Sequence, residues 1–216
     1  YDPEEVTSLE FGFKGSLSEN TSLNASLFRY DYTDFQVLQV VGIQTVTRNA
    51  GDATVNGLEI EALSNVNDSL AINYGLTLLD ATYGEFLNTN GIQPQLGEQQ
   101  LDGNYLTNAP KVSINLGLNY TSPMASGASL TYRANASYKS RIYFSEFNEY
   151  SQDAYTIVDL NLIWESADET FRSRFFIKNA TDEEYISGYL SSATGGGRFG
   201  QWGYPRTAGI EIQRNF

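Results

Sequence analysis

The side chains best suited to binding a small molecule lie in two segments between the predicted strands. Residues 143–150 include four aromatic residues, and residues 198–204 include three more together with Arg198. Aromatic faces bind rings and apolar surfaces, and an arginine holds an anionic group. Packing inside the loops, or in an aromatic girdle, is the alternative for each ring. The candidate ligand-binding residues are Tyr143, Phe144, Phe147, Tyr150, Arg198 and Trp202.

The chain lacks the residues on which common hydrolytic and zinc chemistry depends. It has no histidine and no cysteine, which excludes Ser-His-Asp and Cys-His catalysis and the usual zinc ligands. The run Asp182-Glu183-Glu184 could bind a calcium-like cation, but a charge cluster that faces the lumen or lies at the base of a loop is the favoured interpretation. The glycine-rich run 195–198 lacks the Lys-Ser/Thr pair and the helix of a phosphate-binding loop, and we interpret it as a loop tip. We therefore expect no enzyme activity, no metal site and no cofactor.

The charge balance excludes further classes of partner. The 216 residues include 13 Lys and Arg against 26 Asp and Glu, a net charge of −13. A chain this acidic repels phosphate backbones, so nucleic acid is not an expected partner, and no polybasic segment is available to hold a membrane surface. The 15 Tyr and 12 Phe, together with many Asn, Ser, Thr and Gly, are typical of strands and turns.

Hydrophobic and polar residues alternate with a period of two along most of the chain. Val112 and Ile114, for example, stand on either side of Ser113. This pattern predicts strands with one apolar and one polar face. A change of phase between Leu27 and Phe28 suggests a β-bulge there. The nine predicted strands cover about residues 7–15, 22–40, 44–63, 69–83, 111–120, 130–143, 155–164, 171–187 and 204–216.

The links between these strands alternate between short and long. Short links lie near residues 16–21, 64–69, 121–129 and 165–170, and long ones near 83–110, 140–154 and 188–203. The short link at 41–43 joins the longest strands, so we expect a projecting hairpin. Long loops at one end and short turns at the other are typical of antiparallel outer-membrane barrels. No run of 18 apolar residues predicts a transmembrane helix. A soluble two-sheet protein is the alternative that alternation alone leaves open.

Charged residues on the polar face favour the barrel and its register. A lipid-facing Arg or Lys near the membrane centre costs about 2–4 kcal/mol. A slip of one residue would turn Arg172, Arg174 and Lys178 outward together, at roughly 6–12 kcal/mol. We expect these cations inside the barrel, with Arg133 and Asp159 joining them in a ladder of paired charges. The predicted lumen-facing residues are Arg133, Asp159, Arg172, Arg174, Glu59 and Glu61.

Six segments, in order along nearly the whole chain, resemble the C-terminal part of the β-barrel of a TonB-dependent outer-membrane receptor. They are residues 3–12 (PEEVTSLEFG), 28–35 (FRYDYTDF), 48–61 (RNAGDATVNGLEIE), 108–111 (NAPK), 178–185 (KNATDEEY) and 203–210 (GYPRTAGI), and the chain ends in Phe216. The resemblance implies an all-β, antiparallel up-and-down transmembrane barrel of 22 strands with an N-terminal plug inside. It also implies import of a scarce ligand, such as an iron-siderophore complex or cobalamin, with energy from the TonB complex.

Residues 1–216 are expected to form about the last nine strands of such a barrel. Bacterial single-chain barrels have even strand numbers, and nine strands leave two edges that cannot persist in lipid. The plug and the TonB-contacting segment are expected outside this sequence. The expected partners are outer-membrane lipid, the protein's own plug, the TonB complex and a small-molecule ligand, in the outer membrane of a Gram-negative bacterium. A passive outer-membrane pore and a secreted soluble β protein are the alternatives.

Overall fold

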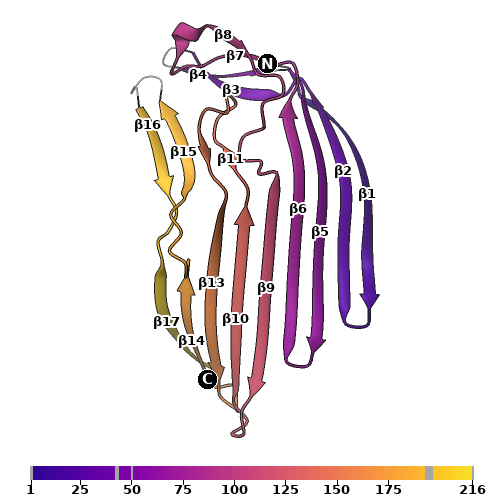
Figure 1. Ribbon diagram of the computed structural model, residues 1–216, viewed down its shortest axis with the longest axis vertical. Coiled ribbons are helices and arrows are strands. Elements are labelled where there is room, and N and C mark those ends of the chain that lie inside the picture. Colours follow the sequence, from indigo (N-terminus) through magenta and orange to yellow (C-terminus); the bar gives the residue numbers. More distant parts are fainter. Residues whose placement is uncertain (1, 42–43, 50, 193–196, 216) are drawn as a thin grey trace.

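The computed structural model describes residues 2–41, 44–49, 51–192 and 197–215. Nine antiparallel strands stand side by side in a single layer, in the order β1-β2-β5-β6-β9-β10-β13-β14-β17 (Figure 1). Their bounds are Glu5–Ser18 (β1), Thr21–Thr33 (β2), Ala53–Asn67 (β5), Leu70–Tyr83 (β6), Val112–Pro123 (β9), Ser129–Lys139 (β10), Tyr155–Glu165 (β13), Phe171–Lys178 (β14) and Thr207–Arg214 (β17). The predicted all-β fold, with nine strands in up-and-down order, is confirmed.

Four two-stranded hairpins and a 3-10 turn form the connections at the upper end of the sheet in Figure 1. Short turns join the strands at the opposite end. The elements are β3 (Gln36–Val41), β4 (Gln44–Asn49), β7 (Leu87–Thr89), η1 (Pro94–Leu96), β8 (Glu98–Gln100), β11 (Ile142–Tyr143), β12 (Ser151–Gln152), β15 (Ile186–Ser192) and β16 (Gly197–Trp202). The predicted asymmetry between long loops and short turns is therefore present. The predicted loop tip at residues 195–198 lies partly outside the described residues.

Two of the predicted strands extend into these hairpins and are longer than the strands in the structure. The predicted strand 22–40 ends at Thr33, because Asp34 takes a left-handed backbone conformation with φ 54°. The predicted strand 171–187 ends at Lys178, where Asn179 (φ 47°) and Asp182 (φ 57°) turn the chain. Left-handed residues cannot continue a ladder, so each hairpin twists away as a separate sheet.

The bulge predicted between Leu27 and Phe28 is absent. The pairing of β1 with β2 runs without a shift from Leu9↔Arg29 to Phe11↔Leu27, and the bulges lie instead beside the short turns. Leu27 therefore stays on the apolar face and Phe28 points to the polar face. A Cβ built on Gly57 would lie 2.1 Å from Cζ of Phe28, so the ring covers this glycine. The change of phase in the sequence therefore arises because an aromatic residue packs on the polar face, and no residue is inserted.

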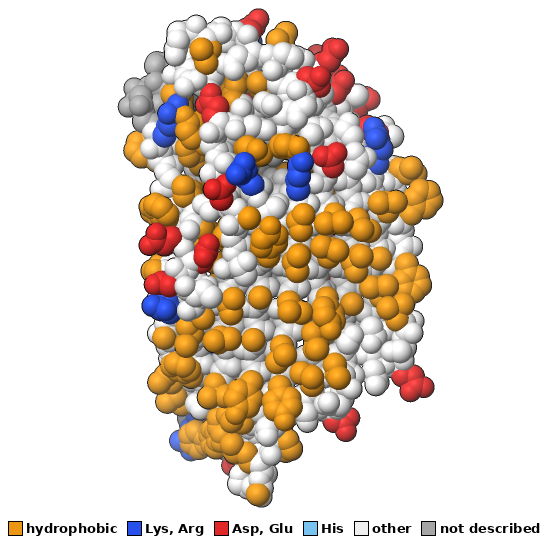
Figure 2. All heavy atoms as spheres, viewed as in Figure 1, with side chains coloured by type: hydrophobic (Ala, Val, Ile, Leu, Met, Phe, Trp, Pro, Cys, Tyr) orange, Lys and Arg blue, Asp and Glu red, His pale blue; other side chains and the backbone are white. Residues whose placement is uncertain are grey.

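The two faces of the sheet differ sharply in chemistry. Directly paired residues share a face, and the rows that contain Phe11, Leu58, Leu116 and Ile210 are apolar on strand after strand. Figure 2 shows these side chains as a broad orange band across the sheet, with charged side chains gathered above it. Phe11 is 67% exposed, so the band has no protein cover within the described residues. No helix in the described part of the chain is long and apolar enough to cross a membrane.

The buried core lies at the loop end of the sheet. Ala53, Tyr83, Phe86 and Leu101 form a cluster in which each residue is at most 6% exposed. Tyr83 is packed between Phe35 and Phe86, with ring centroids 6.2 and 5.1 Å away. This cluster fixes residues 84–110 over the ends of β2, β5 and β6. The sheet itself has no second layer among the described residues, which sets it apart from a two-sheet soluble fold.

Candidate ligand-binding loops and polar face

Three of the six candidate ligand-binding residues come together around one tyrosine. Tyr189 in β15 stacks on Tyr150 and Phe144, with ring centroids 5.0 and 6.0 Å apart. The guanidinium of Arg198 lies 4.3 Å from the centre of the Tyr150 ring. We call Phe144, Tyr150, Tyr189 and Arg198 the aromatic cluster. It joins the loop at 140–154 to the β15–β16 hairpin and combines flat apolar faces with one cation.

Tyr189 is not among the binding residues predicted from the sequence. It lies on the same side of the hairpin as Arg198, because Tyr189 pairs with Gly200 and Ser191 pairs with Arg198. The neighbouring pair Leu190–Phe199 points the other way, with Leu190 66% exposed. The alternation Tyr189-Leu190-Ser191 was present in the sequence. Without the pairing register, however, nothing indicated that Tyr189 faces Tyr150.

The other three candidates lie in different surroundings. Phe147 packs against the buried cluster of Tyr83 and Phe86. Tyr143 stacks on Tyr105 with ring centroids 5.7 Å apart. Trp202 pairs with Ile186 at the base of the β15–β16 hairpin and is 66% exposed. The structure therefore divides the predicted set, and Phe147 serves as a packing residue.

Amide–carboxylate contacts join the loop at 84–110 to the loop at 140–154. The side-chain amide of Asn88 donates to Oε1 of Glu146 at 3.0 Å, and that of Asn90 donates to Oε1 of Glu149 at 2.9 Å. Asn88 and Asn90 are buried. Burial raises the pKa of Glu146 above its ordinary value, and nearby Glu149 acts in the same direction. The loops at 84–110 and 144–150 are thus held as one body above the sheet.

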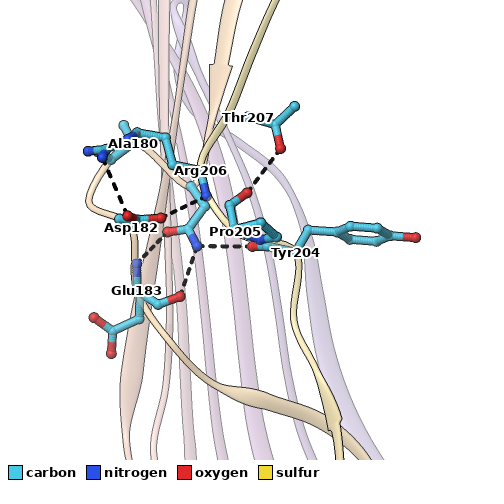
Figure 3. A network of polar contacts seen from close by, with 8 residues as sticks. Ala180, Asp182, Glu183, Tyr204, Pro205, Arg206 and Thr207 are labelled. Carbon is cyan, nitrogen blue, oxygen red and sulfur yellow. Dashed lines mark hydrogen bonds and ion pairs between the residues drawn. The ribbon is translucent and has the colours of Figure 1, made fainter.

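A second polar network holds the base of the β15–β16 hairpin (Figure 3). The buried amide of Asn179 donates to the carbonyl oxygens of Glu183 (2.9 Å) and Tyr204 (3.1 Å), and its Oδ1 accepts from the Glu183 N–H. Arg206 donates from its backbone N–H to Asp182 at 2.9 Å and forms an ion pair with it at 3.4 Å. Asp182 therefore braces the loop base, as the charge-cluster interpretation predicted.

All six predicted lumen-facing residues lie on the polar face of the sheet. The register places Glu59 and Glu61 on β5 in the same rows as Thr77 and Gly75 of β6. These rows continue through β9 and β10 to β13, and later residues of β13 on the same face pair with β14. The register places Arg133, Asp159, Arg172 and Arg174 on the same face as Glu59 and Glu61.

Arg174, Arg133 and Asp159 do not pair with one another as the expected ladder requires, because each of the three has a different partner. Arg174 pairs with Glu211 on β17 at 2.7 Å, and Arg133 donates to Oδ1 of Asn119 at 2.9 Å. Asp159 accepts the backbone N–H of Asn179 at 2.8 Å. Asp159 thus belongs to the network at the hairpin base. The sequence could not show this, because Asn179 reaches Asp159 only after the chain turns at the end of β14.

Charge on the polar face is also unevenly distributed. Glu10, Glu59 and Glu61 line one hollow of about 340 Å³ on β1, β2 and β5, with Lys14 as its cation. Arg172 and Arg174 line another hollow, of about 120 Å³, together with Glu211 and Gln213. Of the four strands between them, β6 and β9 present Thr77, Gly75, Ser113, Asn115 and Gly117 on this face. The face is therefore mostly polar, acidic near β1 and richer in cations near β14, and it also carries some apolar side chains such as Phe28 and Ile163.

Comparison with known proteins agrees with this geometry. Residues 1–180 match the family model of the TonB dependent receptor-like β-barrel. The ferric yersiniabactin uptake receptor FyuA from Yersinia pestis is 19% identical, with a TM-score of 0.81 over 99% of this chain and 30% of its own. The siderophore receptor PiuA from Acinetobacter baumannii is 22% identical, with a TM-score of 0.77 over 98% of this chain and 28% of its own.

The ferric citrate transporter FecA in its unliganded form is 16% identical, with a TM-score of 0.74 over 99% of this chain and 32% of its own. A comparison with the curated proteins gave no match. At these identities the solved structures show the fold, and this chain spans about 30% of the length of the first of them. The family model covers most of the chain and carries the assignment. The chain belongs to the TonB-dependent receptors, as part of their β-barrel.

Proposed function

We propose that this chain forms part of the wall of an outer-membrane transporter that imports a scarce ligand, such as an iron-siderophore complex or cobalamin. The observation that carries the proposal is the nine-stranded sheet with one exposed apolar face and one polar face, in a chain of this family. The TonB-dependent receptors are receptors and transporters of Gram-negative outer membranes. The transporter acts by binding and gating, with no bond made or broken.

In this proposal the apolar band faces lipid and the polar face lines the lumen. A transmembrane barrel needs an outward apolar band and a closed ladder of strands. The chain supplies nine strands, so the remaining strands and the plug come from other parts of the protein. Because Arg174 and Arg172 lie on the polar face, Arg174→Leu is expected to weaken plug seating more than barrel insertion.

We propose that the aromatic cluster forms part of the ligand vestibule. Binding functions concentrate on loops held by a rigid scaffold, and the two polar networks provide that support here. Phe144, Tyr150 and Arg198 remain the favoured ligand contacts, now joined by Tyr189. Tyr143 and Trp202 are flanking positions. An arginine beside stacked rings suits an anionic ligand that carries flat or apolar groups.

Uptake by the full-length protein tests the function directly. Cells that depend on this receptor are supplied with a panel of radiolabelled ferric chelates and with labelled cobalamin, with and without a working TonB complex. Accumulation of one ligand that requires TonB is expected. Ligand-independent leakage of small solutes that persists without TonB would instead favour the passive pore.

The vestibule is tested on alanine variants with equal surface expression. Tyr150→Ala or Arg198→Ala is expected to lower the affinity for the imported ligand by about 2 kcal/mol, roughly thirtyfold. Trp164→Ala, in the apolar band, is the control and should bind as the wild type does. Unchanged binding by every aromatic-cluster variant would move the vestibule elsewhere and leave the transporter proposal intact.

A further inference from the structure

A hollow of about 520 Å³ opens at the upper ends of β9, β10 and β13. Its chemistry comes from six of its lining residues, Tyr105, Lys111, Val112, Arg141, Tyr143 and Asp153. We call it the marginal hollow, because it lies where the apolar band gives way to charged side chains. It is separate from the aromatic cluster, whose rings are Phe144, Tyr150 and Tyr189.

The marginal hollow borders the apolar face of the sheet. Val112 lines it and pairs with Leu78, which lies in the apolar rows of β5 and β6. The next row along β9 holds Ile114, 42% exposed, opposite Tyr138 of β10. A hydrocarbon chain that lies along this row would therefore reach the mouth of the hollow.

Two cations are fixed inside the hollow by different means. The Lys111 ammonium donates to the Tyr105 hydroxyl at 2.5 Å and lies 4.1 Å from the centre of the same ring. This hydrogen bond raises the pKa of Lys111, so the ammonium stays charged. Arg141 is held by Asp153, with Nη2 2.8 Å and Nε 3.0 Å from the carboxylate oxygen Oδ1.

These features match the two ends of an amphiphile. Lysine and arginine are the usual partners of phosphate, and a guanidinium with five donors can serve a carboxylate and a phosphate together. Stacked tyrosines are suited to a position between apolar and aqueous surroundings. Figure 2 shows blue and red side chains along the upper border of the orange band, at the level where lipid headgroups would lie.

We propose that the marginal hollow binds the phosphate of a membrane lipid, whose acyl chains lie along the adjoining apolar rows of β6, β9 and β10. The proposal rests on the proposed function, because it requires the apolar band to face lipid. The chain as a whole is acidic, with net charge −13, so binding depends on the two local cations. A lipid is favoured over free phosphate because Val112 joins the hollow to the apolar band.

The test uses the purified full-length receptor, stripped of lipid and studied by native mass spectrometry. The probes are dioctanoyl phosphatidic acid, dioctanoylglycerol with the same chains but no phosphate, and inorganic phosphate. The double variant Lys111→Gln, Arg141→Gln is compared with Arg29→Gln. Arg29 is a matched control, because it lies at the same border on β2 and pairs with Asp31 at 2.7 Å, outside the hollow.

Wild type and Arg29→Gln are expected to retain phosphatidic acid, and the double variant should lose roughly tenfold in affinity. Dioctanoylglycerol should bind weakly to all three. Equal binding of both lipids, equal retention by the double variant, or displacement of the lipid by equimolar inorganic phosphate would overturn the proposal. If the double variant does not fold, Lys111→Gln alone is measured, with a loss of at least threefold expected.

A folding readout separates failure of this site from failure of the proposed function. Folded barrels migrate differently on gels before and after heating, and this shift is recorded for wild type and each variant. A wild type without the shift would contradict the membrane-barrel proposal itself. A wild type with the shift but without preference for the phosphorylated lipid would contradict only the lipid site.

Discussion

Asn179 shows how one buried amide holds the end of a strand pair. It is 3% exposed, and its side chain donates to two carbonyl oxygens and accepts from the Glu183 N–H. Its own N–H donates to Asp159. The amide thereby ties together β13, the turn after β14 and the approach to β17. A buried backbone group left without a partner costs about 1–3 kcal/mol.

Asn179→Ala should therefore loosen the base of the β15–β16 hairpin. Hydrogen exchange on the full-length receptor is expected to speed up at Glu183 and in residues 203–207, by an amount equivalent to about 1–3 kcal/mol. Thr181→Ala, an exposed change in the same turn, is the matched control and should leave exchange unaltered. Equal exchange in both variants would show that the Asn179 contacts are dispensable.

Among the elements, β2 and β5 are locked by an aromatic ring on the polar side. Phe28 stacks on Tyr30 with centroids 5.0 Å apart and covers Gly57 across the strand pair. In Gly57→Ala the new methyl must displace the Phe28 ring, and Phe28→Ala removes the same contact. We expect each single change to lower the free energy of unfolding by about 1 kcal/mol, and the double change to cost less than the sum.

The measurement is a double-mutant cycle on the full-length receptor, with denaturant midpoints followed by the gel shift of the folded barrel. Gly75→Ala is the control, because its Cβ would meet Asn115 at an ordinary 3.5 Å. Strictly additive effects of the Gly57 and Phe28 changes would mean that the ring and the glycine do not stabilise each other.

The strands and the projecting β3–β4 hairpin were predictable, and the other hairpins were not, for a physical reason. Period-two alternation reports which face of a strand is apolar, so the nine strands and the polar side of Arg133, Arg172 and Arg174 could be read from sequence. The ends of β2 and β14 depend on left-handed residues, Asp34 and Asn179, which alternation does not report. The aromatic cluster depends on contacts between distant loops, so Tyr189 could not be assigned before the fold was known.

The docking of the loop at 84–110 against the loop at 140–154 should depend on pH. Burial raises the pKa of Glu146 in the folded loops above its ordinary value of 4.5. Folding of the loops therefore favours the protonated acid, and docking is strongest below the ordinary pKa. It weakens as pH rises from 4.5 through the raised value and is then constant. Protection of residues 84–110 from protease should fall over that window.

Glu146→Gln should remove most of this dependence and protect the loop at neutral pH, because the amide carries no charge to bury. Glu85→Gln, an exposed change in the loop at 84–110, is the control and should keep the dependence of the wild type. A pH profile that is equally steep in Glu146→Gln and wild type would assign the effect to another group.

At the scale of the whole molecule, the nine strands form an open sheet whose two edge strands each have a partner strand on only one side among the described residues. β1 and β17 are its two edges, and the apolar band on one face has no protein cover within the described residues, as Phe11 at 67% and Ile212 at 76% exposure show. Open edges and exposed apolar faces drive association in water, and open edges are not tolerated in lipid. We therefore predict that residues 1–216 expressed alone do not give a folded, soluble monomer.

The measurement is size-exclusion chromatography with light scattering and circular dichroism on the isolated chain, refolded in buffer and in detergent. Aggregates or mixed oligomers are expected in both. The full-length receptor, refolded under the same detergent conditions, is the control and should give one species with the heat-dependent gel shift of a closed barrel. A monodisperse, strand-rich monomer of residues 1–216 in plain buffer would refute the membrane-barrel interpretation, because its apolar band and its edges would then be stable in water.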